Sequence, residues 1–297
     1  MVVKPIKIDI LGNANTVWVI EHTKIKRERK KQNMKNKYFF KIIIPCFNAE
    51  DYIERCINSI EEQTFKDFII IAIDDQSIDN TFGKVKELSK KYNNIICLTP
   101  TKKVWNGGAR NIGINYDINT EYTLFIDNDD WFDSQDCLSY IYEAIRQNNY
   151  PDCIRLPYIH YKNGKKQSIM LTDNNPKDLV NSCFVAPWTK CIKSDKVVDF
   201  PENTLIEDVV QHIEQCDNID TIGICAKPII CWNRDNVNAC SREENKYRYN
   251  SKRISSIYRN IADLMDLQCN HDYCEEHRKW RIDCYKNLVR EGKEEHF

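Results

Sequence analysis

The fold of this chain is most constrained by a regular alternation of strand-like and helix-like segments that begins at Tyr38. The strand-like segments are apolar runs with few interruptions, as expected of strands covered on both faces of a sheet. The segments between them repeat apolar side chains at helical spacing. The predicted strands cover residues 39–45, 68–73, 94–98 and 122–126, and the predicted helices cover 53–60, 82–88 and 138–145. This order predicts an α/β fold whose open sheet carries helices on both faces and binds ligands at the carboxyl ends of its strands.

The segment before this unit has a different character. Residues 6–10 alternate with period two and residues 17–19 are strand-like, which predicts an N-terminal β-hairpin. This hairpin could also be an edge addition to the main sheet. Residues 24–37 are rich in Lys and Arg, with Glu28 as their one acid. We interpret them as a solvated linker, and contact with nucleic acid or phosphate is the alternative.

The second half of the chain is less regular. A helix is predicted after Glu207 and Asp208, because apolar residues follow them at helical spacing. Residues 221–232 are typical of two strands, and the chain is predicted to be helical from about residue 246 to its end.

Charge and composition narrow the classes of function. The formal net charge is −1, so no global field draws the chain to nucleic acid or to an anionic membrane. Apolar runs stay shorter than the ~18 residues that a membrane span requires. Lys4, Lys7 and Asp9 interrupt any signal-peptide core, so we expect a cytoplasmic protein.

The 14 cysteines are scattered along the chain, and many lie in apolar runs. In a reducing compartment they are typical of small buried hydrophobic residues. A structural zinc at Cys269, His271, Cys274 and His277 is the alternative for the last of them. Their spacing is not the paired C-x-x-C pattern of common zinc sites, so we favour free thiols on helices.

The clearest chemical signal is a cluster of carboxylates at 127–130, where Asp127, Asp129 and Asp130 directly follow a predicted buried strand. Such carboxylates repel one another unless a cation is present. Mg²⁺ and Mn²⁺ take oxygen ligands and are usually held by one or two carboxylates together with substrate phosphates. The cluster therefore predicts a divalent metal at the sheet edge rather than a polar turn that caps the next helix.

Two further motifs lie near the predicted strand ends. Asp74 and Asp75 directly follow the second predicted strand, where a carboxylate can accept hydrogen bonds from the N–H edge of a nucleobase. Gly107 and Gly108 precede Arg110, and they would allow the backbone to approach a ligand while Arg110 reaches a base or diphosphate. A helix-capping loop is the alternative for the aspartate pair.

The order of these motifs resembles family 2 glycosyltransferases of the GT-A fold. The resemblance runs from Lys41 to about Ile145 through five ordered motifs, which are Ile44–Glu50, Ser59–Phe65, Asp74–Thr81, Ala109–Gly113 and Phe125–Trp131. It continues with Trp188-Thr189-Lys190 and Ile206-Glu207-Asp208, which resemble the acceptor-side motifs of that family.

The resemblance implies a fold, an activity and roles for residues. It implies a GT-A domain over 38–235, with a nucleotide-binding half at 38–131 and an acceptor half at 132–235, between the 1–37 extension and a helical region at 236–297. It implies an inverting, metal-dependent transfer from a nucleotide sugar, for which we expect a UDP-sugar with Mn²⁺ or Mg²⁺. The implied donor-binding residues are Pro45, Phe47, Asn48, Asp74, Asp75, Arg110, Asp127 and Asn128. The implied metal ligands are Asp127 and Asp129, and Asp208 is the implied general base. The implied acceptor-side residues are Asp130, Trp131, Trp188, Lys190 and Glu207.

The sequence departs from the family pattern at two places: Gln76 stands where Gly is usual, and the stretch between Leu98 and Arg110 lacks some of the usual glycines. Both departures bear on donor choice. His212 follows Asp208 by one helical turn and is interpreted as a pocket-wall or core histidine rather than a metal ligand.

The acceptor stays open between two classes. We favour a glycan. The alternative is a hydroxymethylated base in phage-type DNA, which would be bound through the basic segments 24–37 and 242–253. A non-catalytic module that binds nucleotide sugars is disfavoured, because residues suited to metal binding and to proton transfer are both present.

Overall fold

The structure is a computed structural model of the whole chain. It describes residues 18–20, 38–171, 176–180, 185–202, 204, 207–236, 239 and 259–290. Within these residues no helix is long and apolar enough to cross a membrane.

A large mixed sheet of eight strands forms the centre of the molecule, in the order β1-β4-β3-β2-β5-β10-β7-β11. Its first half is parallel and follows the predicted alternation closely. The elements are β2 (Tyr38–Cys46), α1 (Ile53–Glu61), β3 (Phe68–Asp74), α2 (Thr81–Lys91), β4 (Ile95–Pro100), α3 (Trp105–Ile114) and β5 (Thr120–Phe125). Because β3 is buried at every position and β2 at nearly every one, their continuous apolar sequence is what this layer requires.

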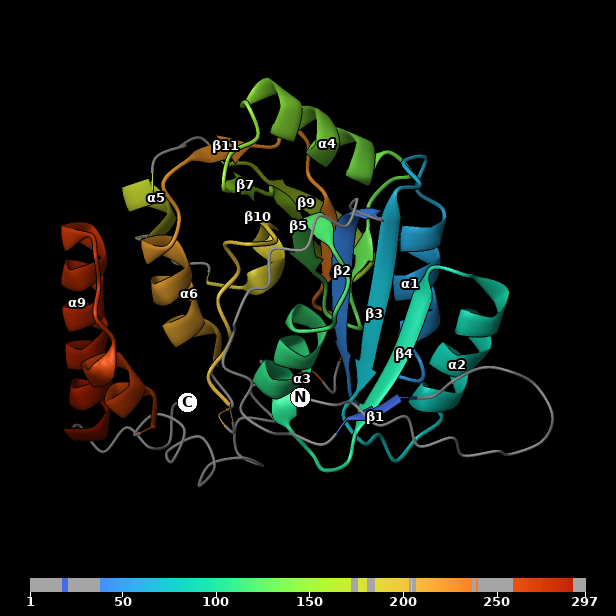
Figure 1. Cartoon of the computed structure of the whole chain (residues 1–297), viewed down its shortest axis with the longest axis horizontal. Helices are drawn as coiled ribbons and strands as arrows, with labels where there is room; N and C mark the ends of the chain where they lie inside the picture. The colour runs from blue at the N-terminus through green and yellow to red at the C-terminus, as the bar shows by residue number, and fades with distance from the viewer. Residues whose placement is uncertain are drawn as a thin grey trace.

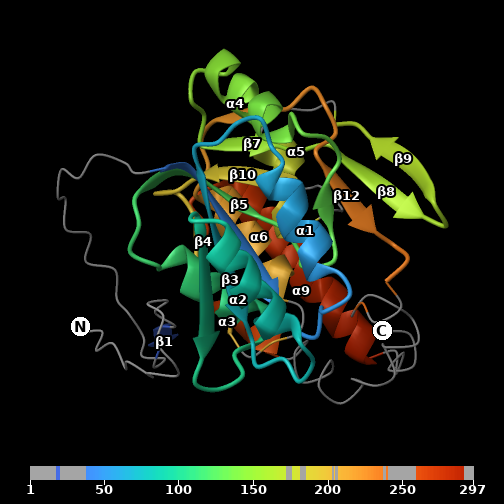
Figure 2. The same cartoon turned by 90° about the vertical axis from the view of Figure 1, so that its right-hand side faces the viewer.

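The second half of the chain extends this sheet and adds a smaller one. The remaining strands of the large sheet are β10 (Lys190–Lys193), β7 (Cys153–Arg155) and β11 (Ile222–Ile224). The smaller sheet has the order β6-β12-β8-β9 and consists of β6 (Trp131–Phe132), β12 (Ile230–Asn233), β8 (Tyr158–Lys162) and β9 (Lys165–Ile169). Figure 2 shows the β8–β9 hairpin projecting from the side of the molecule, with β12 beside it.

Helices cover both faces of the large sheet, as the sequence predicts (Figure 1). The helices α1, α2 and α4 (Cys137–Gln147) lie on one side. On the other side lie α3, α5 (Pro176–Val180), α6 (Glu207–Asp217) and α9 (Asp272–Arg290). A short 3-10 helix, η1 (Pro187–Thr189), precedes β10.

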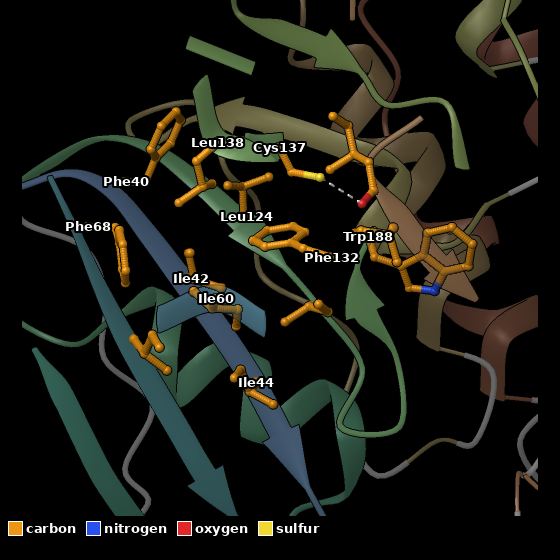
Figure 3. Close-up of a cluster of buried hydrophobic side chains, with 14 of the residues drawn as sticks. Phe40, Ile42, Ile44, Ile60, Phe68, Leu124, Phe132, Cys137, Leu138 and Trp188 are labelled. Carbon is orange, nitrogen blue, oxygen red and sulfur yellow. Dashed lines mark hydrogen bonds between the residues drawn. The ribbon is translucent and has the colours of Figure 1, made fainter. Parts of the chain in front are cut away.

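Two apolar clusters, one on each side of the sheet, hold these layers together. The cluster beneath α1 and α4 joins Phe40, Ile42 and Leu124 of the sheet to Phe132, and it reaches Trp188 (Figure 3). The cluster on the opposite side joins the outward positions of β2 and β3 to α3, α6 and α9. Alternate residues of one strand therefore serve both cores, since successive side chains point to opposite faces.

The two ends of the chain are described only in part. Residues 18–20 form β1, which pairs in parallel with β4, so this segment adds a strand to the edge of the main sheet. The other half of the predicted hairpin, residues 6–10, lies outside the described residues, as do both basic segments. Residues 259–266 and α9 are helical, in agreement with the predicted helical C-terminal region.

Candidate active site

The predicted site residues of the first half lie mainly where β2, β3 and β5 end. The register pairs Cys46 with Asp74 and Ile43 with Phe125, so the loops that follow these three strands start at one edge of the sheet. This is the edge at which an open α/β sheet binds ligands. Asn128 ties two of the loops together, because its amide donates to the carbonyl oxygen of Pro45 at 2.9 Å.

A buried guanidinium lies at the centre of the site. Arg110 of α3 is 3% exposed, and it pairs through Nη2 with Asp127 Oδ1 at 2.9 Å and through Nη1 with Glu207 Oε1 at 2.6 Å. Burial by itself disfavours its charged form, but the two carboxylates raise its pKa. Arg110 therefore joins the end of β5 to the start of α6.

The guanidinium of Arg110, which was expected to reach a base or diphosphate, is directed here towards two carboxylates. Both of its terminal nitrogens are committed to carboxylates, because a buried cation requires charged partners. Glu207 was expected on the acceptor side. It is 4% exposed and acts as one of those partners.

Asp208 follows Glu207 at the first turn of α6 and is partly exposed. Burial raises the pKa of its carboxyl, and the positive charges of Arg110 and Lys190 oppose that shift. The negative charge of Asp127 acts in the same direction as burial. Asp208 therefore lies within electrostatic reach of the Asp127–Arg110 pair, as a general base placed across from the metal ligands would.

The 127–130 carboxylates show strong mutual influence. Burial raises the pKa of Asp129 to about 6, and Asp127 contributes to the rise. Asp129 Oδ2 accepts a hydrogen bond from Asn236 at 2.6 Å. The buried Asp130 accepts one from the backbone N–H of Asn233 at 2.7 Å, and its Oδ2 finds no hydrogen-bond partner among the described residues.

These features fit a divalent cation. The repulsion between these carboxylates is the kind that a bound metal relieves, and carboxylate oxygen is a ligand that Mg²⁺ and Mn²⁺ prefer. No three His, Cys, Asp or Glu side chains converge on a metal position within the described residues.

The expected nucleotide side is formed by the loops after β2 and β3. The side chain of Phe47 is 36% exposed, and the ammonium of Lys103 lies 2.9 Å from the centroid of its ring. Lys103 also pairs with Asp75 Oδ2 at 3.4 Å and donates to the Asp75 carbonyl oxygen at 3.2 Å. Asp75 accepts the backbone N–H groups of Val104 and Trp105 at 2.7 and 2.8 Å, so it caps the start of α3.

The neighbouring residues hold this loop pair in place. Asn48 has a positive φ of 48°, donates its N–H to Ser77 Oγ at 2.9 Å and accepts the N–H of Ile78 at 3.0 Å. Asp74 accepts the N–H of Ser77 at 3.2 Å, and burial raises its pKa. Gln76 has a φ of 59°, the left-handed region that Gly adopts most easily. Gln76 therefore supplies a side chain where Gly is usual, while its backbone still adopts the left-handed conformation.

The predicted acceptor side divides into exposed and buried residues. Trp131 is partly exposed, and the guanidinium of Arg55 lies 3.7 Å from its ring centroid while donating to the Asp129 carbonyl oxygen at 2.9 Å. Trp188 is 2% exposed and packs against Tyr158, so it belongs to the apolar core rather than to a binding surface. Asp130 is likewise buried and braces β12.

Lys190 also differs from its expected role at the acceptor. It is 1% exposed, and its ammonium donates to the carbonyl oxygens of Val185 and Ala186 at 3.2 and 3.0 Å. These bonds close the turn around η1. Burial lowers the pKa of Lys190, and Cys216, Cys153 and Asp208 oppose this shift electrostatically.

The glycine pair was expected to admit a ligand, and the structure gives it a packing role. Gly107 lies inside α3, and a Cβ there would be 2.4 Å from the Pro201 carbonyl oxygen and 3.1 Å from Glu207 Cγ. A Cβ on Gly108 would be 2.7 Å from Val104 Cβ. The absence of side chains therefore lets α3 approach the segment that carries Glu207.

Two groups of the second half bear on metal binding: His212, and the group from Cys269 to His277. His212 is fully buried in α6, and burial lowers its pKa well below the ordinary value, as predicted for a core histidine. His271 pairs with Asp217 at 3.1 Å, and the described side chains of the Cys269–His277 group do not form a three-ligand site. All twelve described cysteines carry free thiols.

Three residues of the site were not identified from the sequence: Lys103, Arg55 and Asn236. Lys103 lies between Leu98 and Arg110, the stretch that departs from the family pattern. That departure was a signal that could have pointed to Lys103. Arg55 is a single charge on a helix, and Asn236 lies in an irregular segment, so local patterns gave no signal for either.

Comparison with known proteins shows which chains this one is similar to. Residues 41–184 match the model of Glycosyl transferase family 2. This match, together with the relatives and solved structures that follow, supports a family 2 glycosyltransferase. A relative from Bacillus spizizenii, a poly(ribitol-phosphate) beta-glucosyltransferase, is 34% identical over 149 residues, which is 48% of this chain and 23% of that protein. The chain covers 14% and 17% of two other curated relatives, so it spans less than a quarter of the length of these proteins.

Solved structures establish the fold of this chain. A Staphylococcus aureus TarS fragment of residues 1–349 in complex with UDP-GlcNAc matches with a TM-score of 0.64 and 19% identity, covering 84% of this chain and 72% of that one. A mannosyltransferase from Pyrobaculum calidifontis in complex with GDP-Man and Mn²⁺ matches with a TM-score of 0.53 and 12% identity, covering 89% and 79%. The mixed sheet with its helices is therefore a GT-A fold.

Proposed function

We propose that the chain is an inverting glycosyltransferase that moves a sugar from a UDP-sugar to an acceptor hydroxyl on a phosphate-containing surface glycan. The observation that carries this proposal is the meeting of Asp127, Arg110, Glu207 and Asp208 beside Asp129 at the carboxyl edge of the sheet. The family match supports the class of reaction, and this geometry supports the choice of residues.

The donor end is formed by Phe47 and Asp75. An exposed aromatic ring offers a face on which a base can stack, and a carboxylate accepts the N–H of a uracil. Asp75 is preferred over Asp74 because it faces the same position as the ring of Phe47, where both contact Lys103. The relative TarS, whose structure contains UDP-GlcNAc, supports a uridine donor.

The metal would be held by Asp127 and Asp129, with Asp130 bracing the loop. When bound, a divalent ion would neutralise the negative charge that develops on the leaving diphosphate. Arg110 orients Asp127 through their ion pair, and it is itself held in place by its second ion pair with Glu207.

The acceptor proton would go to Asp208. As the acceptor oxygen bonds to the anomeric carbon, the bond from that carbon to the diphosphate oxygen breaks, UDP leaves, and the hydroxyl proton moves to the carboxylate. One displacement inverts the anomeric centre. A carboxyl whose pKa burial raises is a stronger base than an ordinary aspartate once it is ionised.

The acceptor proposal rests on charge and on relatives. Arg55 lies over Trp131 next to the 127–130 cluster, and Arg234 lies 4.3 Å from the ring centroid of Trp232 on the small sheet. Such cation–aromatic pairs suit a polymer of sugars and phosphates. Two relatives named poly(ribitol-phosphate) transferases agree with this class. The basic segments that motivated a DNA acceptor lie outside the described residues.

One screen tests the proposal. The protein is incubated with UDP-sugars and Mn²⁺, and mass change is followed on a polyol-phosphate polymer, a neutral glycan and hydroxymethylated duplex DNA. We expect transfer to the polyol-phosphate and none with Asp208→Asn. Transfer to DNA alone would favour the alternative acceptor. Neither transfer nor donor hydrolysis with any UDP-sugar would reject the activity in favour of a binding module.

A further inference from the structure

The position between Phe47 and Asp75 is filled by a side chain of the chain itself. The loop between β4 and α3 carries Lys103, whose ammonium meets the Phe47 ring, the Asp75 carboxylate and the Asp75 carbonyl oxygen. Its side chain is 31% exposed and that of Asp75 is 5% exposed. The contacts are thus made at the mouth of the site rather than in open solvent.

These contacts reproduce what the proposed site would offer a base. An ammonium over an aromatic face replaces a stacked ring, and an N–H donated to a carboxylate replaces the N–H edge of uracil. The lysine and a base therefore compete for the same ring face and the same oxygen. Asp75 stays in place meanwhile, because the backbone N–H groups of Val104 and Trp105 hold it.

We propose that Lys103 occupies the base subsite of the empty enzyme, and that the base of the donor must displace it in order to bind. This inference rests on the proposed function. It makes Lys103 a residue that sets donor affinity and selectivity: a ligand binds only if its gains exceed the lost lysine contacts. Ligands that stack on Phe47 without donating an N–H to Asp75 would be the most strongly excluded.

Lys103→Met tests the inference, because it keeps the aliphatic length and removes the charge. Its neighbour Lys102 is exposed, so Lys102→Met is the matched control for loss of one positive charge from the same loop. Binding of uridine and of UDP is measured by calorimetry or by chemical-shift titration at fixed salt with Mn²⁺ present.

We expect Lys103→Met to bind uridine and UDP about three- to tenfold more tightly than the wild type, the range that one cation–aromatic contact and one partly exposed ion pair support. Lys102→Met should change neither affinity. Because the competition is for the base, the two ligands should gain by similar factors.

Other outcomes would overturn the inference. Weaker binding of UDP with unchanged uridine would show that Lys103 serves the diphosphate instead. Unchanged affinity for both ligands, with wild-type binding intact, would show that the lysine leaves the base subsite at no cost. If neither ligand bound the wild type or the variant, the proposed function itself would fail, and the displacement with it.

Discussion

Glu207→Gln separates the structural and catalytic parts of the site. Glu207 is 4% exposed and holds Arg110 at 2.6 Å, so the change leaves a buried guanidinium with one carboxylate in place of two. Breaking a buried ion pair costs about 3–5 kcal/mol. Because Asp127 stays in place, we expect the lower end, a loss of about 3 kcal/mol in the free energy of unfolding.

Chemical denaturation in urea, followed by circular dichroism, measures this loss. For a domain of this size a destabilisation of about 3 kcal/mol lowers the melting temperature by roughly 6–12 °C. Glu143→Gln provides the control: its side chain is 55% exposed and lies 3.9 Å from Arg146, so it should shift the free energy of unfolding by less than about 0.5 kcal/mol.

Two results would refute this reasoning. If Glu207→Gln were as stable as Glu143→Gln, the buried charge of Arg110 would not depend on Glu207. If it were stable yet inactive with saturating donor, Glu207 rather than Asp208 would take part in the chemistry. A loss of stability, with turnover retained in the folded fraction, is the result that fits the structure.

The other predictions follow from the same geometry. Asp208→Asn should lower turnover by at least about a hundredfold while UDP binding stays near normal, measured by product mass and calorimetry; ordinary turnover would remove Asp208 from the mechanism. Asp129→Ala should abolish transfer, as should excess EDTA on the wild type, and full activity in EDTA would exclude a metal role. UDP with Mn²⁺ should raise the melting temperature, whereas a rise with GDP or CDP but none with UDP would contradict the assigned base. Burial lowers the pKa of His277 to about 4. As the pH falls below the unfolded pKa of about 6.5, the unfolded state gains a proton that the folded state does not yet accept. The free energy of unfolding should therefore be independent of His277 above about pH 6.5 and should fall as the pH drops towards 4. Urea midpoints should decline less steeply over that interval in His277→Gln, and parallel declines would contradict the assignment.

The sequence was sufficient to predict the first half of the fold because the signals there are local. An apolar run such as Phe68–Asp74 and a helical repeat such as Ile53–Glu61 each contain their own pattern. The carboxylates fell at one edge because parallel strands that end together bring their loops together. Of the small sheet only β12 was predicted, as the second of the two strands expected in residues 221–232. The other three strands are two to five residues long and include no long apolar run.

Residue roles were predicted less well than residue positions, and Arg110 shows why. Its partner Glu207 lies 97 residues later, so the charge that Arg110 neutralises could not be inferred from its neighbours. Gly107 is a second example. Glycine disfavours a helix, and the close approach of Pro201 and Glu207 that requires a glycine at Gly107 comes from residues far away in the sequence. Trp188 in η1 and Lys190 directly after it were expected at a surface, because only the fold shows that they are buried.

The pairing of Arg110 also decides which carboxylate is left for proton transfer. Asp127, Glu207 and Asp208 all act on this guanidinium, yet within the described residues its ion pairs are with Asp127 and Glu207. Burial raises the pKa of Glu207 as well as that of Asp208, so geometry rather than pKa separates the two: an oxygen of Asp127 and one of Glu207 are already engaged by Arg110. Neighbours on a helix point in directions about 100° apart, so Asp208 cannot share the contact that Glu207 makes. Asp208 therefore feels the positive charges of Arg110 and Lys190 at a distance, and burial still keeps its pKa raised. Of the three, it is the carboxylate best suited to accept a proton from an incoming hydroxyl.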